Sequence, residues 1–232
     1  MGVFLATLIM ALWGAHLWYA LAVLEVTLDG DAAAAALTVL RVLAHMLIQG
    51  YLYTGLFITA HDAMHQSVSA NRSVNRLYGI VASALFAAFS YRRLVSNHFK
   101  HHRRPGGESD PDFCTKSQNF AVWFVSFFSH YVTVRQLLIM AVLFNVLIRL
   151  APLQNVVLFW VAPAFLGTLQ LFYFGTYRPH MRPHTDEMEP HKARSQRRNH
   201  LWAMLSCYFF GYHHEHHESP GTPWWKLHNL KR

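Results

Sequence analysis

Long apolar runs constrain the fold of this chain more than any other feature. Four of them, residues 3–24, 32–60, 136–150 and 156–177, consist mainly of aliphatic and aromatic residues. A helix needs about 20 such residues to cross the hydrocarbon core of a bilayer, and in lipid it satisfies its own backbone hydrogen bonds. We therefore expect an all-α integral membrane protein with four transmembrane helices. The run at 136–150 is short for a span unless its helix starts earlier.

Three further segments are apolar but are not expected to span the membrane. Residues 77–90 and 201–211 fall well below the length of a spanning helix. They are expected to dip into the membrane and return, or to lie along its surface. The aromatic run at 120–134 has the composition of an interfacial helix. The length of 232 residues fits one membrane-embedded domain, residues 1–232.

The charged residues indicate which membrane side faces the cytoplasm. Lys and Arg outnumber Asp and Glu by 20 to 12. With four spans, all of the Lys and Arg residues except Arg41 and Arg149 lie on one side. The positive-inside rule places that side in the cytoplasm. This distribution accounts for the basic charge without nucleic acid, which we do not expect as a partner. The first apolar run lacks a basic leader and a clear cleavage site, so we expect it to be retained as a helix.

Histidines cluster in three short segments on that same side. Eight of the 17 histidines form these clusters: His61 and His65; His98, His101 and His102; His213, His216 and His217. Residues three or four positions apart lie on the same face of a helix. Each cluster therefore presents a row of imidazoles, and three such rows can converge on metal.

The number and kind of these ligands favour two metal ions. Imidazole binds Fe, Zn, Cu and Ni, and a zinc site uses three or four protein ligands. Eight histidines exceed one zinc site and suit two metals, each with room for a further ligand. A two-iron centre that activates O2 is the natural fit. Cys114 and Cys207 are the only cysteines, so we expect neither a disulfide framework nor a zinc–thiolate site.

Ligating imidazoles need a partner for their second ring nitrogen. Four carboxylates are candidates for this role: Asp62, Asp110, Asp112 and Glu215. We assign catalysis to the eight clustered histidines together with Asp62 and Asp112. Isolated histidines elsewhere are expected to be packing residues. His214 lies about 100° around the helix from its neighbour, so we do not count it as a ligand.

The spacing of the three clusters between apolar runs resembles the membrane histidine-box family of di-iron desaturases and hydroxylases. Within that family, several segments are similar to the bacterial and cyanobacterial β-carotene ketolases. They are YTGLFITAHDAMH at 53–65, HHRRPG at 101–106, DPDF at 110–113, FGTYRPH at 174–180, CYFFGYHHEHH at 207–217 and PWW at 223–225. The resemblance extends from about residue 50 to residue 226 and is more specific than the clusters alone.

The resemblance implies a membrane enzyme with two Fe ions and O2 as co-substrate. It implies that the 4-position of a β-ionone ring of β-carotene is oxidised to a ketone, giving echinenone or canthaxanthin. The carotenoid is expected to enter from the bilayer, among the membrane lipids, and electrons to come from reduced ferredoxin or a similar donor. The resemblance also implies that His180 is a metal ligand outside the clusters, with His184 as its competitor.

The chain departs from the family pattern at three positions. Gln66 stands where the family usually has Gly, Ser219 stands where His is common, and Asn97 before the second cluster is also unusual. None of these changes removes a clustered histidine. Gln66 follows the first cluster directly, so we expect any difference from the family to concern substrate preference.

Other functions stay open at this stage. A carotenoid 3-hydroxylase or a lipid desaturase would share the histidine clusters, but the ketolase-like segments outside the clusters favour ketone formation. A membrane metal transporter would spread its ligands over several spans near the bilayer midplane, whereas here they lie at span ends on one side. A nucleic-acid-binding protein is the weakest alternative because no basic face exists apart from the membrane loops.

Overall fold

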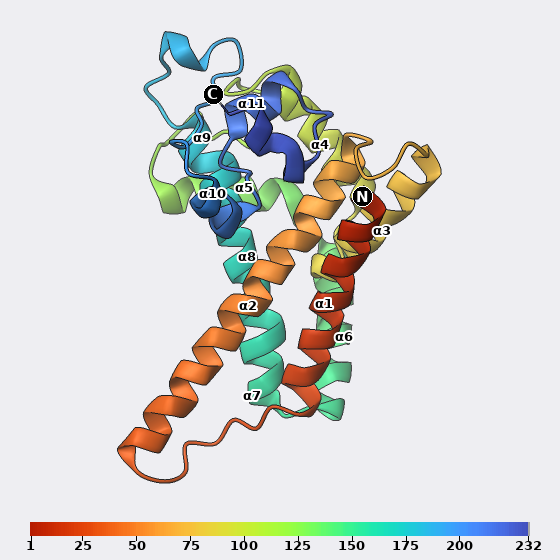
Figure 1. Ribbon diagram of the computed structural model, residues 1–232, viewed down its shortest axis with the longest axis vertical. Helices are drawn as coiled ribbons and strands as arrows, with labels where there is room; N and C mark the ends of the chain where they lie inside the picture. The colour runs from red at the N-terminus through yellow and green to blue at the C-terminus, as the bar shows by residue number, and fades with distance from the viewer. Residues whose placement is uncertain (232) are drawn as a thin grey trace.

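A computed structural model describes residues 1–231, and every regular element within that range is a helix (Figure 1). The expected all-α fold is therefore confirmed for these residues. The longer helices are α1 (Gly2–Ala22), α2 (Ala32–Met64), α3 (Arg72–Ala87), α4 (Tyr91–Arg103), α5 (Phe120–Tyr131), α6 (Val134–Leu150), α8 (Ala162–Phe172) and α10 (His200–Cys207). The shorter elements are α7 (Leu153–Val156), α9 (Arg178–His180), α11 (His213–Glu218), the π-helices η1 (Val157–Val161) and η2 (Tyr173–Tyr177), and the 3-10 helices η3 (Asp186–Met188) and η4 (Trp224–Asn229).

Three helices are long and apolar enough to cross a membrane. They are α1, α2 and a continuous helix over Leu153–His180 that runs from α7 to α9. α5 and α6 meet at a bend of 91° and make a fourth span if the bent pair counts as one. The apolar run expected at 136–150 lies in α6, and the aromatic run expected at 120–134 forms α5 and the bend.

Apolar side chains on these helices face outward. Leu37, Leu47, Leu138 and Val142 each leave 63% to 68% of their surface exposed. Soluble proteins rarely expose apolar patches of this extent, whereas lipid tails solvate them well. The outer surface therefore supports association with a membrane.

Side-chain caps fix where the helices that carry the first two histidine clusters begin. The Asp31 carboxylate accepts a hydrogen bond from the Ala34 backbone N–H at 2.9 Å, which starts α2. Ser90 caps α4 in the same way. Between them, α3 ends at Ala87, and the left-handed backbone of the next residue, Ala88 (φ 53°), turns the chain toward α4. The apolar run at 77–90 therefore forms a short helix that turns back.

α2 is the central helix and packs against α1, α3 and α8. Small residues let α2 and α8 approach closely. A Cβ atom added to Gly167 would lie 3.1 Å from the Gly50 carbonyl oxygen and 3.1 Å from Cβ of Tyr53. In membranes, such small residues allow helices to gain van der Waals contact along their backbones.

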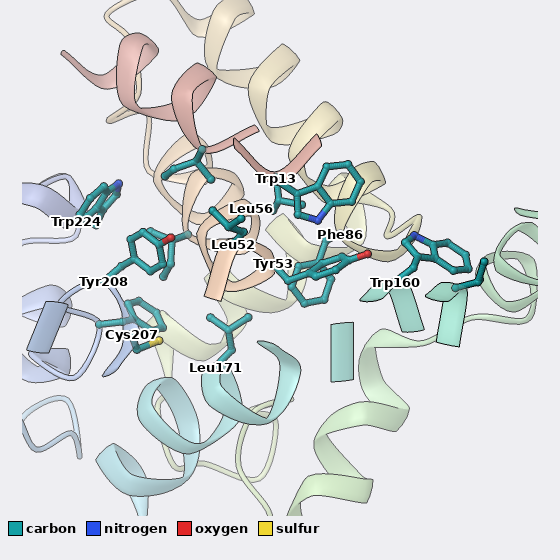
Figure 2. Close-up of a cluster of buried hydrophobic side chains, with 14 residues drawn as sticks. Trp13, Leu52, Tyr53, Leu56, Phe86, Trp160, Leu171, Cys207, Tyr208 and Trp224 are labelled. Carbon is teal, nitrogen blue, oxygen red and sulfur yellow. The ribbon is translucent and has the colours of Figure 1, made fainter. Parts of the chain in front are cut away.

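The largest apolar core joins α1 and α2 to the segments around α10 and η4 (Figure 2). The rings of Trp13 and Tyr53 meet edge to face with centroids 5.5 Å apart. Tyr208 and Trp224 meet in the same way at 5.1 Å. This core holds the chain on both sides of the third histidine cluster against α2, which carries the first.

The two ends of the molecule differ in chemistry. α4, α9, α11 and the last turns of α2 gather at one end, and the loop between α1 and α2 lies at the other (Figure 1). That loop contains Glu25, Asp29 and Asp31 and no Lys or Arg. All three histidine clusters lie at the end opposite this acidic loop.

Candidate metal centre

Nine histidines converge in two groups at the end of α2. Within each group, one ring nitrogen per residue lies within 4.8 Å of those of the others. The first histidine group is His61, His65, His98, His102 and His216, and the second histidine group is His101, His180, His213 and His217. The structure thus brings together the eight clustered histidines and His180.

Helical spacing explains how the clusters divide between the two groups. His98 and His102 are four positions apart on α4 and both enter the first group. His101 lies about 100° around the helix from His102 and enters the second group. α11 is divided between the groups in the same way. Because two helices each contribute to both groups, the groups lie side by side.

The imidazole nitrogens within each group face one another. Nε2 of His65 lies 2.6 Å from Nε2 of His98 in the first group. Nε2 of His101 lies 3.2 Å from Nε2 of His217 in the second. A neutral imidazole has one N–H and one lone pair. Several lone pairs that converge on one point are the donor set of a metal site built from histidine.

Two histidines of the second group have their other ring nitrogen fixed by a hydrogen bond. Nδ1–H of His101 donates to the Asp110 carboxylate at 2.9 Å, and Nδ1–H of His180 donates to the Lys192 carbonyl oxygen at 2.9 Å. Each contact leaves the Nε2 lone pair directed at the group. Nε2 of His180 is buried and has no hydrogen-bond partner within the described chain. An orphaned lone pair in this position fits a metal ligand.

Asp110 is itself held rigidly. Its carboxylate accepts hydrogen bonds from the backbone N–H groups of Gly106 at 2.8 Å and Asp112 at 2.9 Å. These contacts fold the loop after α4 around one carboxylate. The loop thereby fixes the orientation of the His101 ring.

Two other expected carboxylate partners have different main contacts. Asp62 accepts a hydrogen bond from the Trp224 backbone N–H at 3.2 Å and lies 3.7 Å from Nδ1 of His61. Glu215 forms an ion pair with Lys231 at 2.9 Å. These carboxylates therefore tie neighbouring chain segments to α2 and α11.

Burial keeps most imidazoles outside the spans neutral. It lowers the pKa of His65 to about 4 and, with repulsion from neighbouring imidazoles, that of His102 to about 2. It lowers the pKa well below the usual value for His98, His213, His216 and His217. Burial acts in the same direction on His101, but the Asp110 carboxylate outweighs it and raises the pKa of that ring. Neutral imidazole is the form that binds metal.

Three nearby histidines lie outside both groups. A ring N–H of His184 donates to the His180 carbonyl oxygen at 2.9 Å, and one of His214 donates to another backbone carbonyl oxygen at 2.9 Å. The ring of His191 lies 5.5 Å from that of His217 without joining the second group. Of the two candidates given by the family pattern, His180 is the one within the second group.

His180 reaches the second group at the end of an irregular helix. The π-helix η2 directly precedes α9. A π-helical turn holds more residues than an α-helical turn, so it rotates everything that follows it. Gly175 in η2 lies directly against the Phe210 ring, which leaves no room for a Cβ atom there. No repeated spacing in the sequence marks this position.

A mostly apolar, partly enclosed cavity opens onto both histidine groups. His61 and His98 of the first group line it, as do His101 and His213 of the second. Six phenylalanines form much of the remaining wall: Phe57, Phe86, Phe89, Phe127, Phe128 and Phe210. Such a cavity can hold an apolar group beside both groups and exclude water from it.

Asp112 and Tyr131 form a polar pair on the wall of this cavity. The Tyr131 hydroxyl donates a hydrogen bond to Oδ1 of Asp112, and Oδ2 lies 4.0 Å from Nδ1 of His101. Burial raises the pKa of Asp112 to about 6. The sequence patterns pointed to Asp112 but not to Tyr131, because a tyrosine at the end of an aromatic run carries no signal of its own.

Comparisons with known proteins decide the family. The sequence matches the fatty acid desaturase family over residues 36–149 and 130–232. A β-carotene ketolase from Paracoccus sp. (strain PC1) is 40% identical over 85% of this chain and 81% of its own length. The chain belongs to the β-carotene ketolases. The resemblance of the sequence motifs to this family is thereby confirmed.

Algal members of the family match as well. A zeaxanthin 4-ketolase from Chlamydomonas reinhardtii is 38% identical over 97% of this chain, which spans 52% of that relative. A β-carotene 4-ketolase from Haematococcus lacustris is 36% identical over 84% of this chain and 63% of its own length. No solved structure matches the chain. Together with the two histidine groups, family membership supports a metal-dependent enzyme.

Proposed function

We propose that the protein oxidises the 4-position methylene of a β-ionone ring, in β-carotene or a related carotenoid, to a ketone. The products from β-carotene would be echinenone and canthaxanthin. The apolar cavity lined by imidazoles of both histidine groups carries this proposal. A β-ionone ring is a hydrocarbon. Its burial in this cavity is favourable because the ring exchanges contact with water or lipid for van der Waals contact with a close-packed apolar wall. Relatives named as β-carotene ketolases favour this ring over other apolar groups.

We infer that each histidine group holds one iron ion. The donor set fits this assignment because the imidazoles are neutral and their lone pairs converge. Bound iron supplies the activation of O2 that attack on a ring C–H bond requires. The nine ligands and the cavity all belong to one domain, residues 1–232.

The protein's own residues orient the ligands and the ring. Asp110 keeps the proton of His101 on Nδ1, so that Nε2 stays directed at the second group. Asp62 lies beside His61 and ties the Trp224 backbone to α2, which steadies the first group. The phenylalanine walls hold the ring in one orientation and keep water away from the reacting carbon. We therefore place Asp62 in the catalytic set, together with Asp112.

Ketone formation takes two oxidations of the same carbon. In each round, O2 accepts two electrons from a reduced carrier and two protons from solvent. One oxygen atom enters a C–H bond of the ring, and the other leaves as water. The CH2 group becomes CHOH and then C(OH)2, and loss of water from the diol gives the C=O group.

We infer that the carotenoid enters sideways from the bilayer, among the membrane lipids. A second, mostly apolar groove lies between α2 and α8 on the outer surface, where Leu47, Leu52 and Leu166 contribute to its walls. The substrate has no polar atom that would lead it through water. Lipid is therefore the medium from which it partitions into the protein.

We infer that the histidine-bearing end faces the cytoplasm and docks reduced ferredoxin or a similar acidic electron donor. Seven exposed basic residues lie on segments at that end: Arg92, Arg93, Lys100, Arg103, Arg104, Arg197 and Arg198. Salt screens attraction between exposed charges, so turnover with an acidic donor should slow as ionic strength rises. A turnover rate that does not change with ionic strength would contradict this docking face.

Reporter fusions test the cytoplasmic orientation of this end. Green fluorescent protein fused to the C-terminal end should fluoresce, and alkaline phosphatase fused there should be inactive.

Expression in a host that accumulates β-carotene tests the reaction. Chromatography of the pigments should detect echinenone or canthaxanthin. His101→Ala should abolish the ketone while the protein still inserts in the membrane, because the second group loses a ligand. His214→Ala, which changes a histidine outside both groups, is the control. Ketone formation by the His101→Ala protein would contradict the ligand assignment.

The same experiment separates the alternatives. A 3-hydroxylated pigment would indicate a carotenoid hydroxylase with the same centre. A new double bond in membrane lipid would indicate a desaturase. Bound metal with no O2 consumption and no new product would indicate a metal transporter.

A further inference from the structure

Asp112 and Tyr131 place polar atoms in a cavity whose proposed substrate is a hydrocarbon. Both side chains line the cavity beside His101 and His213. Burial of a carboxylate and a phenol costs hydration free energy, which is recovered only where the groups form hydrogen bonds. A β-ionone ring of β-carotene offers no atom for such a bond. The starting substrate therefore leaves unused any acceptor capacity that remains after the hydrogen bond between the two side chains.

The pair has acceptor capacity that the protein does not use. The Tyr131 hydroxyl donates its hydrogen to Oδ1 of Asp112, which leaves lone pairs on the tyrosine oxygen. Oδ2 of Asp112 lies 4.0 Å from Nδ1 of His101, beyond hydrogen-bond length. No other donor within residues 1–231 reaches this Oδ2 atom. The pair can thus accept a hydrogen bond from a bound molecule.

Neighbouring contacts fix the pair relative to the second histidine group. The Trp123 indole N–H donates to the Asp112 carbonyl oxygen at 2.7 Å. The Asp112 backbone N–H donates a hydrogen bond to the Asp110 carboxylate, which also accepts a hydrogen bond from Nδ1–H of His101. A hydroxyl group bound by the pair would therefore stay close to the ligands of the second group.

We propose that Tyr131 and Asp112 bind the hydroxyl of the 4-hydroxylated ring and hold it for the second oxidation. This inference rests on the proposed function. The first oxidation converts CH2 to CHOH with O2 and two electrons from the carrier, so the ring gains its first polar group beside the histidines. That hydroxyl donates a hydrogen bond to the tyrosine oxygen or to Oδ2 of Asp112. The bond favours the second oxidation over release of the alcohol.

Replacement of Tyr131 by Phe tests this role because it removes the hydroxyl and keeps the ring. In a host that makes β-carotene, the ratio of 4-hydroxylated to 4-keto pigment should rise by about tenfold, as expected for the loss of one hydrogen bond. Tyr177→Phe is the matched control. It removes a phenol hydroxyl that donates instead to the Gln118 carbonyl oxygen at 3.1 Å, and the pigment ratio should not change.

Kinetics distinguish binding of the alcohol from a merely structural role. With each substrate supplied separately to membranes, the KM of Tyr131→Phe for the 4-hydroxylated carotenoid should rise several-fold more than its KM for β-carotene. An unchanged pigment ratio, or KM values that rise by the same factor, would overturn the inference. Ketone missing even from the unsubstituted protein would instead refute the proposed function.

The unsubstituted protein supplies a second test that does not depend on folding of the variant. The 4-hydroxylated carotenoid should inhibit oxidation of β-carotene with an inhibition constant several-fold below the KM for β-carotene. The extra hydrogen bond is the reason for this tighter binding. An inhibition constant equal to or above that KM would overturn the inference.

Discussion

At the scale of single residues, the contact between Asp110 and His101 decides which ring nitrogen carries the proton. Asp110→Asn keeps the size of the side chain and removes the charge that raises the pKa of His101. We expect ketone formation to fall by about 10- to 100-fold, together with the iron content, because partners of metal ligands contribute on this scale. Glu108→Gln, at an exposed position of the same loop, is the control. Equal losses in the two variants would argue against a specific role for Asp110.

His180 and His184 form a second matched pair. His180 joins the second histidine group, whereas His184 donates to a backbone oxygen. His180→Ala should therefore reduce bound iron toward half, because the second group loses one of its four imidazoles while the first group is intact. His184→Ala should retain the full content. Iron per chain, measured by elemental analysis of the purified proteins, distinguishes the two, and the reverse order would reassign the ligand.

Sequence spacing predicted the residues of the site only where one helix aligns them. His98 and His102 share a face of α4 by simple geometry, so their convergence could be foreseen. His180 lies beyond a π-helix and came from the family pattern alone. Tyr131 reaches the cavity from the end of α5, beside the 91° bend to α6. Such a bend depends on tertiary packing, which apolar periodicity does not encode.

At the scale of helices, the close approach of α2 and α8 should control stability. Gly167→Leu would drive a side chain into the Gly50 carbonyl and Tyr53, and overpacking of this kind costs about 1–3 kcal/mol. Gly14→Leu is the matched control, since a Cβ atom at Gly14 meets nothing within 4 Å. The thermal unfolding midpoint in detergent should fall for Gly167→Leu and stay unchanged for Gly14→Leu. Equal midpoints would show that the α2–α8 contact tolerates separation.

The apolar runs predicted the existence of the helices better than the positions where the helices end and turn. The run at 156–177 was foreseen, but the helix continues to His180 because π-helical turns keep its hydrogen bonds unbroken. The run at 77–90 could be recognised as too short to span. A return of the chain was one of the two expected outcomes, but its position at Ala88 could not be foreseen, because an alanine in the left-handed region is set by tertiary contacts and not by propensity.

At the scale of the whole molecule, burial acts on the same histidines that we propose as metal ligands. Six of the clustered imidazoles outside the spans have a pKa lowered by full or partial burial: His65, His98, His102, His213, His216 and His217. In the unfolded chain these groups titrate near pH 6.5. Below about pH 6.5, the unfolded state of the metal-free protein therefore binds more protons than the folded state. The free energy of unfolding consequently decreases as the pH is lowered. His101 and Asp112, whose pKa values are raised, oppose this trend.

Chelation of the metal should consequently expose a pH dependence of stability. We expect the thermal unfolding midpoint of the chelated protein to drop between pH 7.5 and pH 5.5, with each of the six imidazoles contributing up to about 1.4 kcal/mol per pH unit. The metal-loaded protein should change less over the same range, because coordinated nitrogens do not take up protons until the metal leaves. Tryptophan fluorescence in detergent measures both midpoints. A chelated protein with equal midpoints at the two pH values would mean that its histidines are hydrated, and that the metal itself closes the centre.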